Sequence, residues 1–191
     1  MQTPLKQIQK TLRRNSSEKG REAFRKFVPG SQGVYGVRVP VLNKLAVEYK
    51  TGGFDLVEEL WRSGAFEERL LAAKILTKVS RKDPDRTLKL IGSFSKDISD
   101  WAVCDTLGQQ STRPIAAIRQ KEIFALSKKL VRSRSLWERR LSLVLLETSS
   151  KDVQAHPFIR SIMEKLEDDR EYYVKKAVEW TKRNLEQRRQ M

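Results

Sequence analysis

Two side chains with complementary chemistry stand four positions apart near the middle of the chain. Trp101 and Asp105 occur in the stretch Ser-Asp-Trp-Ala-Val-Cys-Asp, residues 99–105. Residues four apart in a helix project from the same face, so we expect a broad aromatic ring beside a carboxylate. The ring can support a sugar or a base, and the carboxylate can stabilise positive charge that develops next to it. This pair is the first candidate for a reactive site.

The neighbouring polar residues have simpler interpretations. Asp100 follows Ser99 and precedes Trp101, so we interpret it as a helix N-cap rather than as a catalytic group. Cys104 is the only cysteine and His156 the only histidine in the sequence. One cysteine excludes an intramolecular disulfide, and the two residues together make no zinc-binding constellation. We therefore predict neither a metal nor a cofactor.

The charge balance concerns the binding partner rather than the fold. The 191 residues include 39 Lys and Arg against 24 Asp and Glu, which gives a net charge of +15. Nucleic acid is the commonest polyanion that would bind such a surface, and an anionic membrane is the alternative. No apolar run approaches the roughly 18 residues that a membrane-spanning helix needs, and residues 1–10 lack the apolar segment of a signal peptide. We expect a cytoplasmic protein that does not bind membranes.

Helices must position the candidate residues, because no window shows the sustained alternation that is typical of strands. The one glycine-rich connection is residues 29–40, which ends in Pro40, a residue that favours the start of a helix. Gly20 is a weak point within the first expected helix. The expected helices cover residues 1–28, 41–49, 55–62, 66–79, 85–94, 100–109, 114–129, 136–147, 153–166 and 172–187.

An internal repeat connects these helices. The aromatic residues Phe66, Trp101, Trp137 and Tyr173 lie 35, 36 and 36 residues apart. Such a period suits antiparallel helix pairs that stack into a solenoid, each pair burying its apolar face on its neighbours. Tetratricopeptide repeats share the period but need small residues and a proline that are missing here. We therefore predict an all-α fold, a single-domain α-α superhelix of HEAT-like repeats over residues 1–191, with a concave basic face.

Five motifs taken in order carry a more specific resemblance. They are Tyr-Gly-Val-Arg-Val-Pro at 35–40, Glu-Glu-Arg at 67–69, Trp101 with Asp105, Trp-Glu-Arg-Arg at 137–140, and Val-Lys-Lys-Ala-Val-Glu-Trp-Thr-Lys-Arg at 174–183. Together the motifs resemble the DNA alkylation repair family, the AlkD-like HEAT-repeat DNA glycosylases. The resemblance implies a monomer whose partner is double-stranded DNA containing alkylated bases, located in the cytoplasm and associated with the nucleoid through that DNA.

The resemblance also implies a role for individual residues at the reaction centre. Asp105 matches the catalytic carboxylate, and Trp101 and Trp180 match two aromatic plates that pack against the sugar and backbone around the lesion. The family offers a further aromatic side chain from its first helix. Phe24 and Phe27 both lie in that region, and the sequence does not choose between them.

Basic residues near the aromatic positions match the family's contacts to the DNA backbone. Arg140 stands three residues after Trp137 and corresponds to a phosphate-binding arginine. Arg183 stands three residues after Trp180 and corresponds to a second backbone contact. Further DNA-binding candidates are Arg139 and Lys176.

The reaction that the resemblance implies suits these residue types. A purine alkylated at N3 or N7, such as 3-methyladenine or 7-methylguanine, is cationic and therefore leaves without a general acid. The protein must stabilise positive charge on the sugar and admit water, as in oxocarbenium-like glycoside hydrolysis. A carboxylate between electron-rich rings can stabilise the sugar cation and position the water. No lysine nucleophile is required, so the resemblance implies a monofunctional glycosylase in base excision repair, without lyase activity.

Simpler interpretations stay open for each residue. Trp101 and Trp180 could serve helix packing, as we expect for Trp137 at a repeat junction, and Arg139 and Arg140 could simply solvate a helix face. A non-catalytic protein that binds damaged or branched DNA, or a protein-interaction scaffold, would also show a helical repeat. A pure backbone binder has no use for a carboxylate that repels phosphate, so the sequence favours the enzyme.

Overall fold

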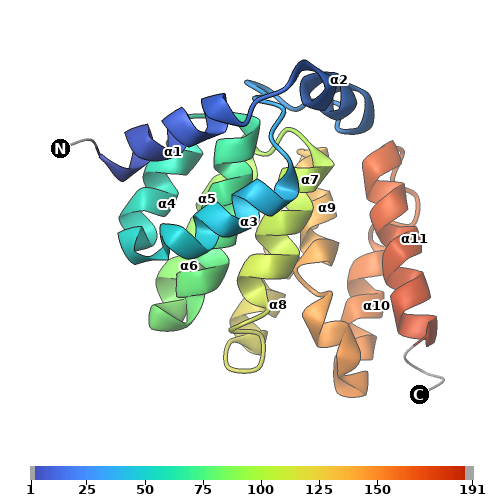
Figure 1. Cartoon of the computed structure of the whole chain (residues 1–191). Coiled ribbons are helices and arrows are strands. Elements are labelled where there is room, and N and C mark those ends of the chain that lie inside the picture. Colours follow the sequence, from blue (N-terminus) through green and yellow to red (C-terminus); the bar gives the residue numbers. More distant parts are fainter. Residues whose placement is uncertain (1–2, 188–191) are drawn as a thin grey trace.

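The computed structural model describes residues 3–187, which form α-helices and short turns and contain no strand (Figure 1). The predicted all-α class is confirmed. The helices are α1 (Pro4–Arg14), α2 (Glu18–Phe27), α3 (Val39–Glu48), α4 (Gly53–Arg62), α5 (Phe66–Val79), α6 (Pro84–Phe94), α7 (Trp101–Asp105), α8 (Gln120–Leu130), α9 (Leu136–Val144), α10 (His156–Glu164) and α11 (Tyr172–Gln187). In this described part, no helix combines the length and the apolar character needed to cross a membrane.

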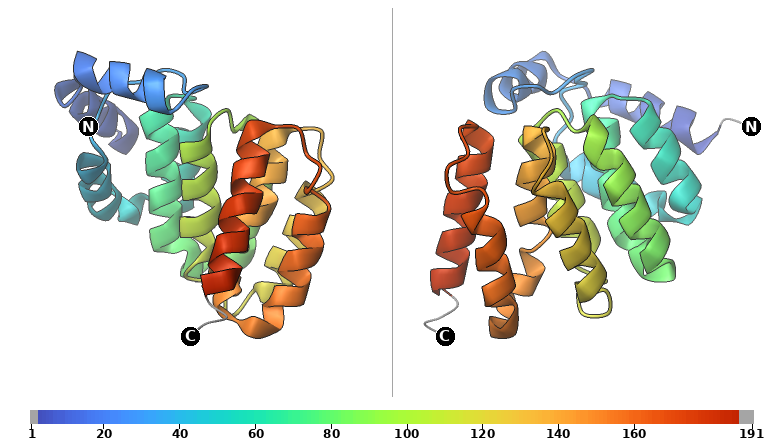
Figure 2. Two further views of the ribbon diagram at one scale, coloured as in Figure 1. Left: turned by 90° about the vertical axis from the view of Figure 1, so that its right-hand side faces the viewer. Right: turned by 180° about the vertical axis from the view of Figure 1, so that it is seen from behind.

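The helices after α3 alternate between two layers. Helices α5, α7, α9 and α11 lie side by side in the inner layer, and α6, α8 and α10 form the outer layer behind them (Figures 1 and 2). Helix α3 packs against α5, while α1 and α2 lie across one end of the inner layer. This is the stacking of helix pairs in an α-α solenoid, as the repeat predicts.

The core follows from this stacking. One continuous cluster of buried apolar side chains extends from Ile8 in α1 to Leu185 in α11. Helix α5 is buried on nearly all sides because α3, α4 and α7 surround it. Even Glu67 near its start is fully buried, because its carboxylate accepts three backbone N–H groups from residues 35–37, at 2.7–2.9 Å. The loop before α3 is therefore fixed to the start of α5.

The N-terminal region differs from the single helix expected over residues 1–28, of which Met1 and Gln2 lie outside the described residues. The chain breaks after α1, and Ser17 caps α2 by accepting the Gly20 backbone N–H at 3.1 Å. The break therefore comes from the capping serine rather than from the glycine. Gly20 instead permits close packing, because a Cβ atom there would lie 2.1 Å from the Gly36 carbonyl oxygen.

The segment after the middle of the chain also differs from its expected helix. Residues 113–118 form turns, and α8 begins at Gln120 rather than at Pro114. Proline disfavours helical geometry in the residue before it, and here the Pro114 carbonyl accepts a hydrogen bond from Arg81 at 2.9 Å. Helix α10 likewise starts at His156, three residues later than expected, because short 3-10 turns fill residues 148–155.

Candidate functional site

The candidate site is built around α7, which begins at Trp101. Asp100 caps this helix, since its Oδ1 atom accepts the Val103 backbone N–H at 2.8 Å. The interpretation of Asp100 as a cap is thus confirmed. Its side chain is buried, and burial raises the pKa of Asp100 to about 6, although hydrogen bonds from backbone N–H groups act in the opposite direction. The start of α7 is therefore fixed by a carboxyl group that is costly to keep charged.

The indole of Trp101 links α7 to the end of α2. Its Nε1–H donates to the Phe27 carbonyl oxygen at 2.9 Å, while the ring is half-buried. Just beyond Phe27, Gly30 has a φ of +91°, and a Cβ atom there would lie 2.1 Å from the Ser99 carbonyl oxygen. Only glycine allows this contact. The end of α2 and the loop after it thus lie directly on the residues that begin α7.

The two candidate phenylalanines of α2 have different surroundings. The Phe24 ring lies 5.0 Å from the Phe66 ring, between centroids, and packs against the core. Phe27 is 65% exposed, and its own carbonyl accepts the Trp101 hydrogen bond. The accessible aromatic beside Trp101 is therefore Phe27, a choice that the sequence left open.

The Asp105 carboxylate is bound on both oxygens by Arg140. The Arg140 Nε–H donates to Asp105 Oδ1 at 2.9 Å, and Nη2 donates to Oδ2 at 2.8 Å. A third donor, Nη1, reaches the Tyr173 carbonyl oxygen at 2.6 Å. Arg140 is 8% exposed, whereas the Asp105 side chain keeps 32% of its exposure. The carboxylate is consequently fixed in orientation and still reachable from solvent.

This contact joins three adjacent inner helices. Asp105 ends α7, Arg140 lies in α9, and Tyr173 lies in α11. Burial alone would lower the pKa of Arg140, but hydrogen bonding to Asp105 and its negative charge outweigh burial and raise that pKa above its ordinary value. The guanidinium therefore stays positively charged and compensates the carboxylate.

Trp180 lies on the same side of α11 as the residue that holds Arg140. It stands seven residues, or two helical turns, after Tyr173 and is half-buried. Lys176 and Arg183 are exposed on the same helix. The buried stripe of α11 that faces its neighbours consists of Val174, Ala177, Thr181 and Leu185.

A sequence model of the family described as DNA alkylation repair enzyme matches residues 8–190. The chain belongs to the DNA alkylation repair enzyme family. No curated protein sequence matches the chain significantly. Membership of this family supports a role in DNA repair with DNA as the partner. All the site residues described above lie within the matched region.

Arg139 and its neighbour Arg140 have different partners in the structure. Arg139 Nε donates to Asp169 Oδ2 at 2.6 Å, and its Nη1 donates to the carbonyls of Ser133 and Arg134 at 3.1 and 2.9 Å. Its guanidinium thus ties α9 to the link between α10 and α11. These contacts give Arg139 a packing role in the free protein, and the DNA contact that the sequence suggested for it stays a prediction.

Of the remaining candidates, Trp137 packs between helices, whereas Lys176 and Arg183 lie on the surface. The Trp137 ring lies 5.1 Å from the Tyr173 ring, between centroids, which confirms its expected packing role. Lys176 pairs with Glu179 at 3.0 Å, an exposed contact of small energetic weight. Arg183 has neither a hydrogen bond nor an ion pair within residues 3–187. It is thus the freest of the predicted basic residues.

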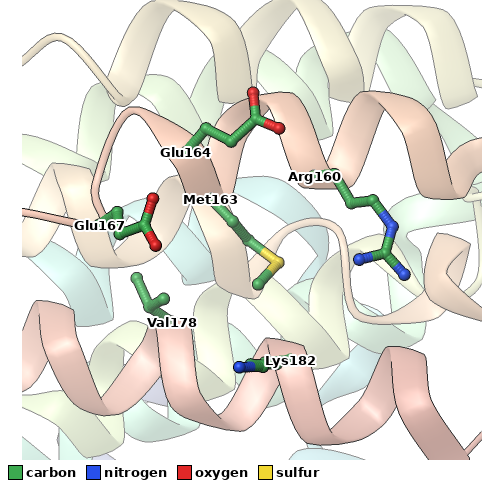
Figure 3. A pocket seen from close by; sticks show the side chains of 6 residues that line it. All are labelled: Arg160, Met163, Glu164, Glu167, Val178 and Lys182. Atoms are coloured by element: carbon green, nitrogen blue, oxygen red, sulfur yellow. The ribbon is translucent and has the colours of Figure 1, made fainter.

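Two features of the structure were not predicted from the sequence. A π-helical segment, η4 (Thr106–Gln110), continues α7 directly after Asp105, and such segments often occur at functional sites. The residue types there give no signal for it. A hollow between α10 and α11 is lined by Arg160, Met163, Glu164, Glu167, Val178 and Lys182 (Figure 3), and it includes none of the predicted site residues.

Proposed function

We propose that this member of the DNA alkylation repair family is a monofunctional DNA glycosylase. Its substrates are cationic N3- and N7-alkylated purines, such as 3-methyladenine and 7-methylguanine, in duplex DNA. The observation that carries the proposal is the half-exposed carboxylate of Asp105, which Arg140 binds on both oxygens at 2.8 and 2.9 Å. This carboxylate ends a short helix that begins with Trp101.

The main contribution of the protein to this reaction is electrostatic stabilisation. The C1′–N bond of the alkylated nucleotide breaks, and its electron pair neutralises the departing base, so no acid is needed. Positive charge develops on the sugar, and the Asp105 oxygens stabilise it. Water then adds to C1′ and loses a proton to solvent. A fixed, charged group is more effective here than a mobile one, because it needs no reorganisation during the reaction.

Arg140 acts in this proposal as a positioning residue. Three of its five N–H donors are used by Asp105 and Tyr173. The arginine compensates the carboxylate charge at longer range, so that a phosphate backbone can approach a site that contains an acid. Its two remaining N–H groups leave room for the phosphate contact that the sequence suggested.

Three aromatic residues on different elements are proposed to line the site around this carboxylate. Trp101 belongs to α7, Phe27 to the end of α2, and Trp180 to α11. We propose that their faces pack against the sugar and backbone at the lesion and keep bulk water away from the developing charge. Lys176 and Arg183 on α11 are proposed to contact phosphates farther along the strand.

Base release tests the proposal directly. Duplex DNA treated with a methylating agent is incubated with the protein, and free 7-methylguanine and 3-methyladenine are quantified by mass spectrometry. We expect release of both bases well above a control without protein. Tight DNA binding without release would instead favour the alternative, a non-catalytic protein that binds damaged or branched DNA.

A further inference from the structure

Lys74 in α5 is a buried cation without a partner. It is 9% exposed, and its ammonium makes no hydrogen bond or ion pair within residues 3–187. Burial first, and the charge of Lys78 second, lower the pKa of Lys74 below its ordinary value. The side chain of Lys74 is largely buried, but its Nζ atom still reaches solvent. Partial burial weakens the hydration of the ammonium, so an anion bound there would compensate it.

The place of Lys74 in the repeat sets it close to the candidate site. Helix α5 packs against η4, and the Ser111 hydroxyl donates to the Ala73 carbonyl oxygen at 3.2 Å. This bond fixes the register, so Lys74 and Gln110 occupy neighbouring positions on two adjacent inner helices. They are 36 residues apart, close to the 35-residue spacing of Asp105 and Arg140. Each pair therefore links neighbouring inner helices across one repeat, and Lys74 and Gln110 lie about one helical turn beyond the level of Asp105.

The glutamines of η4 extend this polar strip. Gln110 follows Asp105 by five residues, the spacing of an i→i+5 contact in a π-helix. Gln109 and Gln110 are both half-buried, and neither side chain makes a hydrogen bond in the part of the chain that the structure describes. A free amide can donate to an anionic oxygen. The strip from Asp105 to Lys74 thus offers unused donors on two helices.

We infer that Lys74, together with the amide of Gln110, binds a phosphate of the DNA strand whose lesion lies at Asp105. The inference rests on the proposed function for the choice of DNA as the anion. Packed helices lie about 8–10 Å apart, so this phosphate belongs to a nucleotide close to the lesion. Binding it compensates the partly buried ammonium and relieves the repulsion between Lys74 and Lys78, which stand four residues apart on one helix face.

The matched substitution is Lys74→Met, which keeps a long side chain and removes the charge. Lys89→Met serves as the control, since Lys89 is exposed in α6 of the outer layer. Binding to an undamaged duplex oligonucleotide is measured by fluorescence anisotropy over a range of salt concentrations. For Lys74→Met we expect affinity about 5- to 10-fold weaker at 0.1 M salt, and a log–log salt slope reduced by about 0.9. Lys89→Met should match the wild type.

A structural role for Lys74 predicts a different pattern of results. If the lysine served only packing, Lys74→Met would lower the melting temperature and leave the salt slope unchanged. A phosphate contact instead predicts an unchanged or higher melting temperature with a smaller slope, and recovery of the slope in Lys74→Arg. A wild-type slope in Lys74→Met would overturn the inference, and Lys74→Gln replaces it if that protein does not fold. Because the probe is undamaged DNA, absence of base release would contradict the proposed glycosylase activity and leave this result standing.

Discussion

Arg140 in α9 binds both carboxylate oxygens of Asp105 in α7, with distances of 2.8 and 2.9 Å. The two residues are 35 positions apart in the sequence, which is one repeat of the solenoid. Because successive inner helices lie side by side, residues one repeat apart become neighbours in space. The repeat thereby brings together two opposite charges that are distant in the sequence, while the Asp105 carboxylate stays partly exposed.

Replacing Arg140 by lysine tests whether this arginine positions Asp105. A lysine offers a point charge and cannot hold two oxygens in one plane, so we expect Arg140→Lys to slow base release about 10- to 100-fold. In a protein that already carries Asp105→Asn, adding Arg140→Lys should cause a smaller loss of rate or none, because the two residues act as a unit. Single-turnover release assays of both single variants and the double variant measure this coupling.

Arg139→Lys is the matched control for that experiment. Arg139 also pairs with a carboxylate, but its partner is Asp169 in the link between α10 and α11 rather than Asp105. We expect it to change thermal stability without changing the rate of release. Strictly additive losses in the double variant of Arg140 and Asp105 would contradict the positioning role.

The two phenylalanines of α2 should respond in opposite ways to substitution by alanine. Phe24→Ala removes a ring that packs on Phe66 and the core, so we expect the free energy of unfolding to fall by about 2–4 kcal/mol. Phe27→Ala removes a ring that is 65% exposed and should leave stability nearly unchanged. Chemical denaturation and DNA-binding assays compare the two. Weakened DNA binding by a fully stable Phe27→Ala protein is the expected result, and unchanged binding would remove Phe27 from the interface.

Asp100 makes stability depend on pH. Its pKa of about 6 in the folded protein is above the ordinary value of 3.8, so the folded state binds the proton more tightly than the unfolded state. The stability that this group contributes is therefore present below about pH 4 and is lost as the pH rises to about 6. An asparagine can still cap α7 but cannot ionise.

Asp100→Asn should accordingly gain stability relative to the wild type as the pH rises. The difference in unfolding free energy between the two proteins should grow by about 2–3 kcal/mol between pH 4 and pH 6.5 and stay constant above that range. Urea denaturation at several pH values measures it. A difference independent of pH would mean that burial of Asp100 does not oppose its ionisation.

Much of the architecture could be predicted from residue patterns. Helices α5 and α11 match their expected ranges, because apolar spacing and clear boundaries specify long helices well. The period of the aromatics placed Phe66 and Trp101 at the starts of successive inner helices. The break before Ser17 and the turns after Pro114 were missed, because they depend on a local cap and on tertiary hydrogen bonds that periodicity does not reveal.

The candidate site was only partly accessible from sequence. The Asp100 cap could be predicted, because N-capping is local chemistry. The pairing of Asp105 with Arg140 was not, since Arg140 was expected to face phosphate. Choosing Phe27 over Phe24, and recognising Lys74 as unpaired, required burial and contacts that only the packed helices determine.

The central claim is that the Asp105 carboxylate stabilises the developing sugar cation. Asp105→Asn keeps the shape of the side chain and removes its charge, and exposed Asp168→Asn is the matched control. The decisive measurement is the single-turnover rate of 7-methylguanine release from a methylated duplex at saturating protein. We predict a rate about 10²- to 10³-fold below wild type for Asp105→Asn, with DNA binding retained and Asp168→Asn unaffected. Release by Asp105→Asn at the wild-type rate would contradict the account.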